Sequence, residues 1–290
     1  MPAPLSRPLA ELRVRRLTPA DLVACADLCE DRGWPRDEHR WGLLLAAGTG
    51  YGIDDPGGGQ GLAATCVVTS YGPRLAAIGM LLVAERHARQ GIARHLMLRM
   101  IDEAGDTPLS LYATSAGLPL YEQLGFEPVA RAERVTGRFV PVNGGEHTVG
   151  VRPATAEDLR VLVQLDAEVF GVDRTHVLAR LPAYADQLRV AEDNGRLVGY
   201  AAAWPSARTQ VIGPLIAPDT RTAQALVTSL ASASDLPLRA DVDARHAELL
   251  VWLKERGLRT DSDTTLMTYG APDLPGDWTR RFAPLTVAMG

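Results

Sequence analysis

The sequence predicts an α+β protein made of two similar halves, each a mixed, mostly antiparallel sheet flanked by helices. Its 290 residues are enough for two domains of ordinary size. Short segments of the first half recur in the same order in the second half. Runs of β-forming residues also alternate with stretches in which apolar residues fall at helical spacing. Hydrophobic residues make up 46% of the chain and charged residues 22%, which is typical of a globular protein.

The recurring segments indicate an internal duplication. Residues 14–22 recur as 151–159, residues 78–83 as 212–217, and residues 124–126 as 256–258, with displacements of 137, 134 and 132 residues. The common order and the slowly drifting displacement are typical of a duplicated domain with small deletions. We therefore predict a first domain over residues 1–141 and a second domain, with a C-terminal tail, over residues 148–290. The turn-forming residues 142–145 would join them.

The elements of the first half follow from the spacing of apolar and turn-forming residues. A weakly alternating strand precedes a helix that Thr18 begins as N-cap and Pro19 as first helical residue. In order, we predict a strand at 12–17, this helix, a helix at 38–47, strands at 50–53, 62–71 and 75–83, a loop and helix at 86–104, a strand at 109–113, a helix at 117–124 and a final strand or hairpin at 128–139. The three consecutive strands would form an antiparallel run.

The turn between the strand at 75–83 and the following helix has the properties of an anion site. Gly91 and Ala93 are small residues in the first helical turn, so a ligand can approach the backbone closely. The first N–H groups of the helix and its dipole would face an anion, and Arg86, Arg89 and Arg94 would add positive charge. The pattern therefore favours a pyrophosphate cradle, although a glycine at a helix start is also common in ordinary packing. G-x-G-x-x-G and G-x-x-x-x-G-K-[ST] motifs are absent.

A second feature lies about 30 residues further on. Residues 114–126 read as a strand exit, a short helix that carries Tyr121, and Gly125 as its C-terminal cap. The Tyr121 phenol could protonate a departing thiolate, but it could also be one more half-buried aromatic side chain.

Together these residues resemble the GCN5-related N-acetyltransferase (GNAT) superfamily. The resemblance rests on residues 79–83, the turn at 90–93 and the L-Y-E-Q-L-G-F run at 120–126. It covers residues 13–139 well, and residues 151–270 look like a weaker second copy, as in tandem members. It implies an acetyl-coenzyme A site in which the backbone of Leu81, Leu82 and Val83 pairs with the pantetheine arm and the turn formed by Ala88, Arg89, Gln90, Gly91, Ile92, Ala93 and Arg94 holds the pyrophosphate. Ala88 departs from the family, which usually has Gln or Arg there, so one side-chain contact is missing.

The resemblance also implies an acyltransferase that uses acetyl-CoA as acyl donor. A primary amine of a small molecule or peptide would attack the thioester directly, strand amides would hold the oxyanion, and Tyr121 would protonate the sulfur. Cys66, in a strand, is expected to be core rather than catalyst. Candidate bases are Glu30, Asp54, Asp55 and Glu85, and a water relay ranks above them. The walls of the acceptor site would come from residues 29–41 and the end of the first domain, with Trp34, Trp41 and Tyr51 available, although all three could equally be core.

The second copy has lost these features, so we expect it to be degenerate. Gly91 corresponds to Ala225, Ala93 to Val227 and Tyr121 to Leu253. We predict that this half packs on the first, covers the acceptor side and binds no coenzyme A. The distinctive run 166–174 is expected to be structural. An alternative is a CoA-binding pseudoenzyme or scaffold without turnover.

Composition excludes several other classes. A net charge of −5 with scattered Lys and Arg disfavours nucleic acid and anionic membranes as partners. The three cysteines form no C-x-x-C pair, and no Cys/His spacing suggests a metal site. The first 30 residues lack a signal-peptide pattern, and no stretch approaches 18 apolar residues. We therefore expect a cytoplasmic protein, as a monomer or homodimer.

Overall fold

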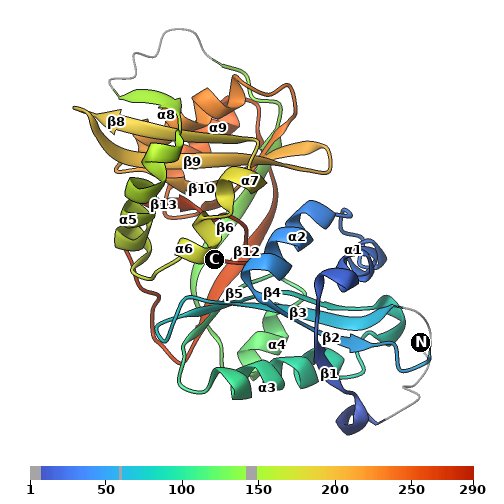
Figure 1. Cartoon of the computed structure of the whole chain (residues 1–290). Coiled ribbons are helices and arrows are strands. Elements are labelled where there is room, and N and C mark those ends of the chain that lie inside the picture. Colours follow the sequence, from blue (N-terminus) through green and yellow to red (C-terminus); the bar gives the residue numbers. More distant parts are fainter. Residues whose placement is uncertain (1–7, 59–60, 142–148) are drawn as a thin grey trace.

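A computed structural model describes residues 8–58, 61–141 and 149–290 (Figure 1). It confirms the predicted α+β fold class, because both halves repeat one order of strands and helices around a mixed, mostly antiparallel sheet. The predicted join at residues 142–145 lies outside the described residues.

The first half has the predicted order of elements. It contains β1 (Val14–Arg16), α1 (Leu22–Asp31), α2 (Glu38–Ala47), β2 (Thr49–Asp54), β3 (Leu62–Ser70), β4 (Ala76–Val83), α3 (Ile92–Ala104), β5 (Leu109–Ala113), α4 (Leu118–Gln123) and β6 (Glu127–Gly137). The predicted run of three strands is confirmed, since β2, β3 and β4 pair antiparallel. Helix α3 buries Ile92, Leu96 and Met100 as one stripe. The final segment is a single strand rather than a hairpin.

The second half repeats this order. It contains β7 (Gly150–Pro153), α5 (Leu159–Phe170), α6 (Thr175–Leu178), α7 (Leu181–Tyr184), β8 (Gln187–Asp193), β9 (Arg196–Ser206), β10 (Thr209–Ile216), α8 (Thr220–Ala231), β11 (Leu238–Asp243), α9 (Ala247–Glu255), β12 (Arg259–Tyr269) and β13 (Arg281–Ala283). Even local details recur. Arg15 donates to Asp21 at 2.7 Å in the first half, and Arg152 donates to Asp158 at 2.8 Å in the second. Both aspartates close a capping box with a threonine.

The two halves exchange their last long strands. In the described residues the strands form one continuous sheet in the order β1-β2-β3-β4-β5-β12-β6-β11-β10-β9-β8-β7, with β13 paired to β10. Strand β12 of the second half lies beside β5 of the first, and β6 of the first half lies beside β11 of the second. The pair β6 and β12 runs through the middle of the molecule (Figure 1). This exchange leaves neither half with an exposed edge at the junction.

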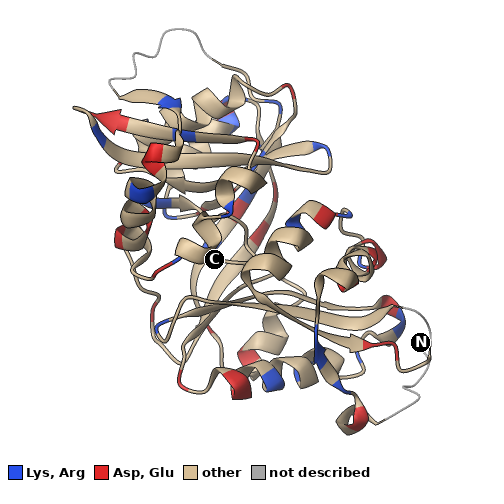
Figure 2. Ribbon diagram, in the orientation of Figure 1, with Lys and Arg blue, Asp and Glu red and all other residues tan. Residues whose placement is uncertain are grey.

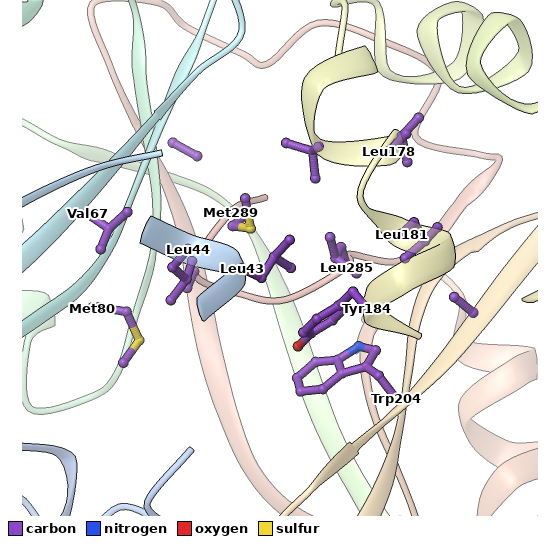
Figure 3. Close-up of a cluster of buried hydrophobic side chains, with 14 of the residues drawn as sticks. Leu43, Leu44, Val67, Met80, Leu178, Leu181, Tyr184, Trp204, Leu285 and Met289 are labelled. Carbon is purple, nitrogen blue, oxygen red and sulfur yellow. The ribbon is translucent and has the colours of Figure 1, made fainter. Parts of the chain in front are cut away.

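Three apolar clusters hold the molecule together. One lies between α3 and the first half's sheet, and another lies between α8, α9 and the second half's sheet. The third joins the halves, because Leu43 and Leu44 of α2 and Met80 of β4 share it with Leu181, Tyr184 and Trp204 of the second half (Figure 3). The second half therefore packs on the α2 side of the first, while α3 and α4 cover the other side (Figure 1).

Charged residues are distributed evenly over this scaffold. Figure 2 shows Lys and Arg interleaved with Asp and Glu in both halves. Within the part of the chain that the structure describes, every helix is too short or too polar to span a lipid bilayer.

Candidate active site

The end of β4 carries a β-bulge. Thr65 of β3 pairs with Leu82, and Val67 pairs with Gly79. Two residues of β4, Met80 and Leu81, therefore face one residue of β3, Cys66. Met80 takes a left-handed backbone conformation with φ of 52°, which costs a β-strand residue about 1 kcal/mol or more. The Thr65 hydroxyl donates to the Met80 carbonyl at 3.0 Å and helps to hold the bulge.

Strands β4 and β5 separate just before this bulge. Their parallel ladder runs from Ala76 paired with Leu109 to Ile78 paired with Leu111 and ends there. The edge of β4 that faces β5 is therefore not paired with it over the predicted residues Leu81, Leu82 and Val83. An extended ligand can add hydrogen bonds to such an edge. Leu82 itself is buried toward α2, while the side chains of Leu81 and Val83 are partly exposed.

The turn after β4 is held by one carboxylate. Asp55 at the end of β2 accepts from Arg86 at 2.8 Å and contacts His87 Nε2 at 3.0 Å. The turn continues through Ala88, Arg89 and Gln90, and Arg89 has a left-handed φ of 60°. The charge that was predicted for Arg86 is thus already engaged, whereas Arg89 is exposed beside the turn.

Helix α3 begins directly after this turn with open backbone amides. Gly91 is the N-cap with φ of 84°, and no side chain caps the helix. Ile92 is buried, so it can offer only its backbone, while Ala93 is half-buried and Arg94 exposed. A Cβ at residue 91 would also lie 2.9 Å from Leu9 Cδ1. Glycine is therefore needed both for its backbone conformation and for the packing of the N-terminal segment.

Tyr121 lies on the α3 side of the sheet. Its ring packs against Phe126 at 6.0 Å, and Gly117 leaves room for it, since a Cβ there would be 3.0 Å from Tyr121 Cε2. Burial, and to a smaller degree the Cys66 thiol, raise the pKa of Tyr121 well above its usual range. Cys66, which faces the β4 bulge, belongs to the apolar cluster that Tyr121 packs against. With its raised pKa, Tyr121 remains protonated at neutral pH. Such a phenol can donate a proton.

The candidate bases are engaged in ion pairs. Glu30 contacts Arg36 at 3.2 Å, Asp54 contacts Arg15 at 2.8 Å, Asp55 holds the turn described above, and Glu85 pairs with Arg32. Each of these carboxylates has an arginine partner, and the choice between them and a water relay stays a prediction.

The aromatic walls predicted for an acceptor are only partly available. Trp41 is fully buried and donates to Cys29 Sγ at 3.2 Å, so it belongs to the core. Tyr51 donates to Glu103 of α3 at 2.6 Å and therefore lies on the other side of the sheet. For these two residues the structure favours the alternative that the sequence left open, namely that they belong to the core. Trp34, in the connection between α1 and α2, is 38% exposed.

All three cysteines are buried and unpaired with one another. Burial raises the pKa of the Cys66 thiol to about 12, so it is a poor nucleophile, as the sequence suggested. Among the described residues, no three His, Cys, Asp or Glu side chains gather as a metal site would require.

The second half fills the places that are open in the first. The turn between β10 and α8 is shorter than the turn between β4 and α3, so Ala225 and Val227 lie inside α8. The predicted correspondence of these two residues with Gly91 and Ala93 was therefore wrong.

Asp219 is the N-cap of α8, and its carboxylate accepts from the Thr222 amide at 2.8 Å. Leu253 takes the place of Tyr121. The Tyr121 carbonyl accepts from the Phe126 amide, and the Leu253 carbonyl accepts in the same way from the Leu258 amide. The groove that opens between β10 and β11 after Ile212 contains β13, which pairs with β10 at Leu215 and Ile216.

Sequence reasoning missed this use of residues 281–290. After β13 the chain crosses from the second half to the first. A Cβ at Gly213 of β10 would lie 2.2 Å from the Pro284 carbonyl oxygen, and a Cβ at Gly79 of β4 would lie 2.3 Å from that of Ala288. Gly79 and Gly213, which occupy the same place in the two halves, thus make room for the segment 284–288 where it passes between the halves. Tyr71 and Arg174 bond the carbonyls of Met289 and Gly290.

The predicted structural run at 166–174 is part of the same junction. Asp166 and Arg174 form a fully buried ion pair at 2.7 Å, and Tyr200 donates to Asp166. A buried pair of this kind is strongly destabilising to break.

Known proteins with a similar sequence or structure support the fold described above. Two family models, each described as an acetyltransferase (GNAT) domain, match residues 66–141 and 162–283. The chain belongs to the GNAT superfamily as a tandem member. Its class is therefore that of the acyltransferases.

Individual relatives span nearly the whole chain. An uncharacterized N-acetyltransferase of Bacillus subtilis (strain 168), YitH, is 27% identical over 83% of this chain and 86% of its own length. A protein from Pyrococcus horikoshii that is described as a putative acetyltransferase has a similar structure, with a TM-score of 0.80 and 19% identity over 96% of both chains. A tandem GNAT protein from the clavulanic acid biosynthesis pathway has a TM-score of 0.62 and 13% identity over 91% of this chain and all of its own. At these identities the structural matches support the fold.

Proposed function

We propose that the first half binds acetyl-CoA and transfers its acetyl group to a primary amine of a small molecule or peptide. The observation that carries the proposal is the contrast between the two helix starts, α3 with Gly91 and uncapped amides and α8 with its own Asp219 carboxylate. An anion such as pyrophosphate is stabilised at the first and repelled at the second.

In the proposed reaction the neutral amine attacks the thioester carbon, forming a C–N bond. Backbone amides of β4 near the bulge stabilise the oxyanion. The C–S bond then breaks, Tyr121 gives its proton to the departing sulfur, and water accepts the proton that the nitrogen loses. The direct route needs no protein nucleophile, which agrees with the buried cysteines.

Calorimetric titration of the whole chain with acetyl-CoA, combined with thiol release in the presence of an amine panel, tests this function. We expect one acetyl-CoA bound per chain and thiol release with at least one amine. Two bound molecules per chain would contradict the assignment of a single site. Binding without release for any amine would instead support the alternative of a CoA-binding pseudoenzyme.

A further inference from the structure

Three buried hydrogen-bond donors at the contact between the halves have no acceptor among the described residues. They are Arg40 Nε in α2, Tyr184 Oη at the end of α7 and Arg239 Nε in β11. The residues Arg40 and Tyr184 are only 7% and 6% exposed. We refer to these three side chains as the interdomain donor cluster. A buried polar group without a partner is costly, so the cluster calls for an acceptor from outside the chain.

The contacts around α2 bring the cluster together. Asp37 caps α2 by accepting from the Arg40 amide at 2.9 Å, and it also accepts from Ser206 of β9 at 2.7 Å. His39, two residues after Asp37, stacks on the Tyr184 ring with the ring centres 4.3 Å apart. Its Nε2 also contacts the Tyr184 carbonyl at 2.8 Å. The start of α2 is therefore fixed to the second half by two contacts, one with β9 and one with the end of α7.

The charges around the cluster favour an anion. The strand register places Arg239 on the same face as Tyr184, because Arg239 pairs with Val211, Val211 pairs with Trp204, and the Tyr184 ring packs on Trp204 at 5.0 Å. Two buried carboxylates face three guanidinium groups: Asp37 lies 3.8 Å from Arg40, while Asp241 binds Arg134 at 2.7 Å and Arg239 at 3.3 Å. One positive charge remains. Because arginine can only donate, the partner that fits is a carboxylate, which accepts several hydrogen bonds.

The cluster lies on the α2 side of the sheet, as does the Met80 side chain at the β4 bulge. Arg40 precedes Leu44 by four residues, about 6 Å along the axis of α2. Leu44 belongs to the same apolar cluster as Met80 at the β4 bulge (Figure 3). The donor cluster and the Met80 side of the bulge are therefore connected by one layer of buried side chains on the α2 side of the sheet.

We propose that the interdomain donor cluster binds the carboxylate of the acceptor, so that the acceptor is an amine that also carries a carboxylate, as amino acids and peptides do. This inference rests on the proposed acetyltransferase function and names its substrate class. It also gives the second half a role in catalysis, since Tyr184 and Arg239 come from that half and Arg40 from the first.

The test uses pairs of probes that differ only at the carboxylate. Amino acids and dipeptides are each compared with their C-terminal amides, first by thermal stabilisation of the full chain without acetyl-CoA and then by thiol release with it. We expect the acids to stabilise the protein and to react with at least tenfold higher kcat/KM than the amides. Arg40→Gln and Arg239→Gln should each remove this preference, while Arg196→Gln on exposed β9 surface should retain it.

The two readouts separate this inference from the proposed function. Stabilisation by acids that Arg40→Gln abolishes, without any thiol release, would support the carboxylate site and contradict the acetyltransferase. Equal behaviour of acids and amides, or no stabilisation by any probe, would overturn the inference and would mean that water alone fills the cluster. If Arg40→Gln fails to fold, Arg239→Gln decides, because the Arg239 side chain is 14% exposed and less embedded.

Discussion

The turns before α3 and α8 occupy equivalent places in the two halves but offer an anion opposite surroundings. Before α3, Gly91 adopts φ of 84° and provides no side chain that would cover the helix amides. Before α8, Asp219 already binds the Thr222 amide and adds a negative charge. The fold of a duplicated domain can therefore persist while a single capping residue determines whether its helix start can receive a ligand.

The grooves beside these turns differ in the same way. Between β4 and β5 the ladder ends at Ile78, and between β10 and β11 it ends at Ile212. In the second half β13 occupies the opening, with the Ala217 amide donating to the Arg280 carbonyl at 3.1 Å. Two similar openings are thus used differently: one contains the protein's own strand, and we propose that the other receives the pantetheine arm.

The most direct test of this difference is to place a negative charge at the start of α3, where α8 already has Asp219. Ala93→Asp should weaken acetyl-CoA binding by at least ~100-fold, because two unit charges about 4 Å apart repel by about 4 kcal/mol at the effective dielectric of a protein surface. An acid in the first turn favours the helix, so the fold should persist. Isothermal calorimetry measures the affinity.

Leu98→Asp is the matched control, since Leu98 lies on the same helix and is 47% exposed. It should leave the affinity unchanged. Gly91→Glu is a poorer test because any side chain there would be strained and would contact Leu9. Full affinity in Ala93→Asp would remove the cradle from the start of α3.

Tyr121 is the second difference between the halves. Tyr121→Phe should lower kcat by ~100-fold, the usual range for loss of a general acid, and leave the affinity for acetyl-CoA unchanged. Since the pKa of Tyr121 is raised above its ordinary value by burial, its titration should cause no loss of kcat between pH 7 and about 10. Stopped or continuous thiol assays give both values.

Tyr269→Phe provides the control, because Tyr269 also packs on Phe126, at 5.3 Å. Its kcat should match that of the unchanged protein. If Tyr121→Phe behaves in the same way, another group protonates the sulfur.

The crossing of residues 281–290 between the halves can be tested at Gly79. Gly79→Ala should destabilise the protein by about 2 kcal/mol, as overpacking generally does, because its Cβ would meet the Ala288 backbone. A lower midpoint in thermal unfolding would show this. Gly42→Ala in α2 should be neutral or stabilising, since its Cβ meets only Leu22 at 3.9 Å. Equal midpoints for the two variants would show that the segment does not pack on β4 in solution.

The sequence predicted those parts of the fold and candidate site that depend on neighbouring residues. The order of elements, the Gly91 turn and the position of Tyr121 before Gly125 are local patterns, and they appear at the expected places. The exchange of β6 and β12 and the docking of β13 depend on pairing between residues far apart, which no local pattern specifies. The left-handed Met80 has no signal in its residue type. Asp219 did have one, because an aspartate directly before a helix is a common N-cap.

Removal of the Asp219 cap should have the smallest effect of these substitutions, and it tests whether the cap alone distinguishes the two helix starts. Asp219→Ala should cost about 1 kcal/mol of stability through loss of the cap, measured as a lower unfolding midpoint. It should not create a second acetyl-CoA site, because β13 would still occupy the groove beside β10. A calorimetric stoichiometry that rises from one toward two in this variant would show that the cap alone had closed the second site. If the stoichiometry stays at one, both the cap and the docked strand distinguish the halves, and reopening the second site would require removal of both.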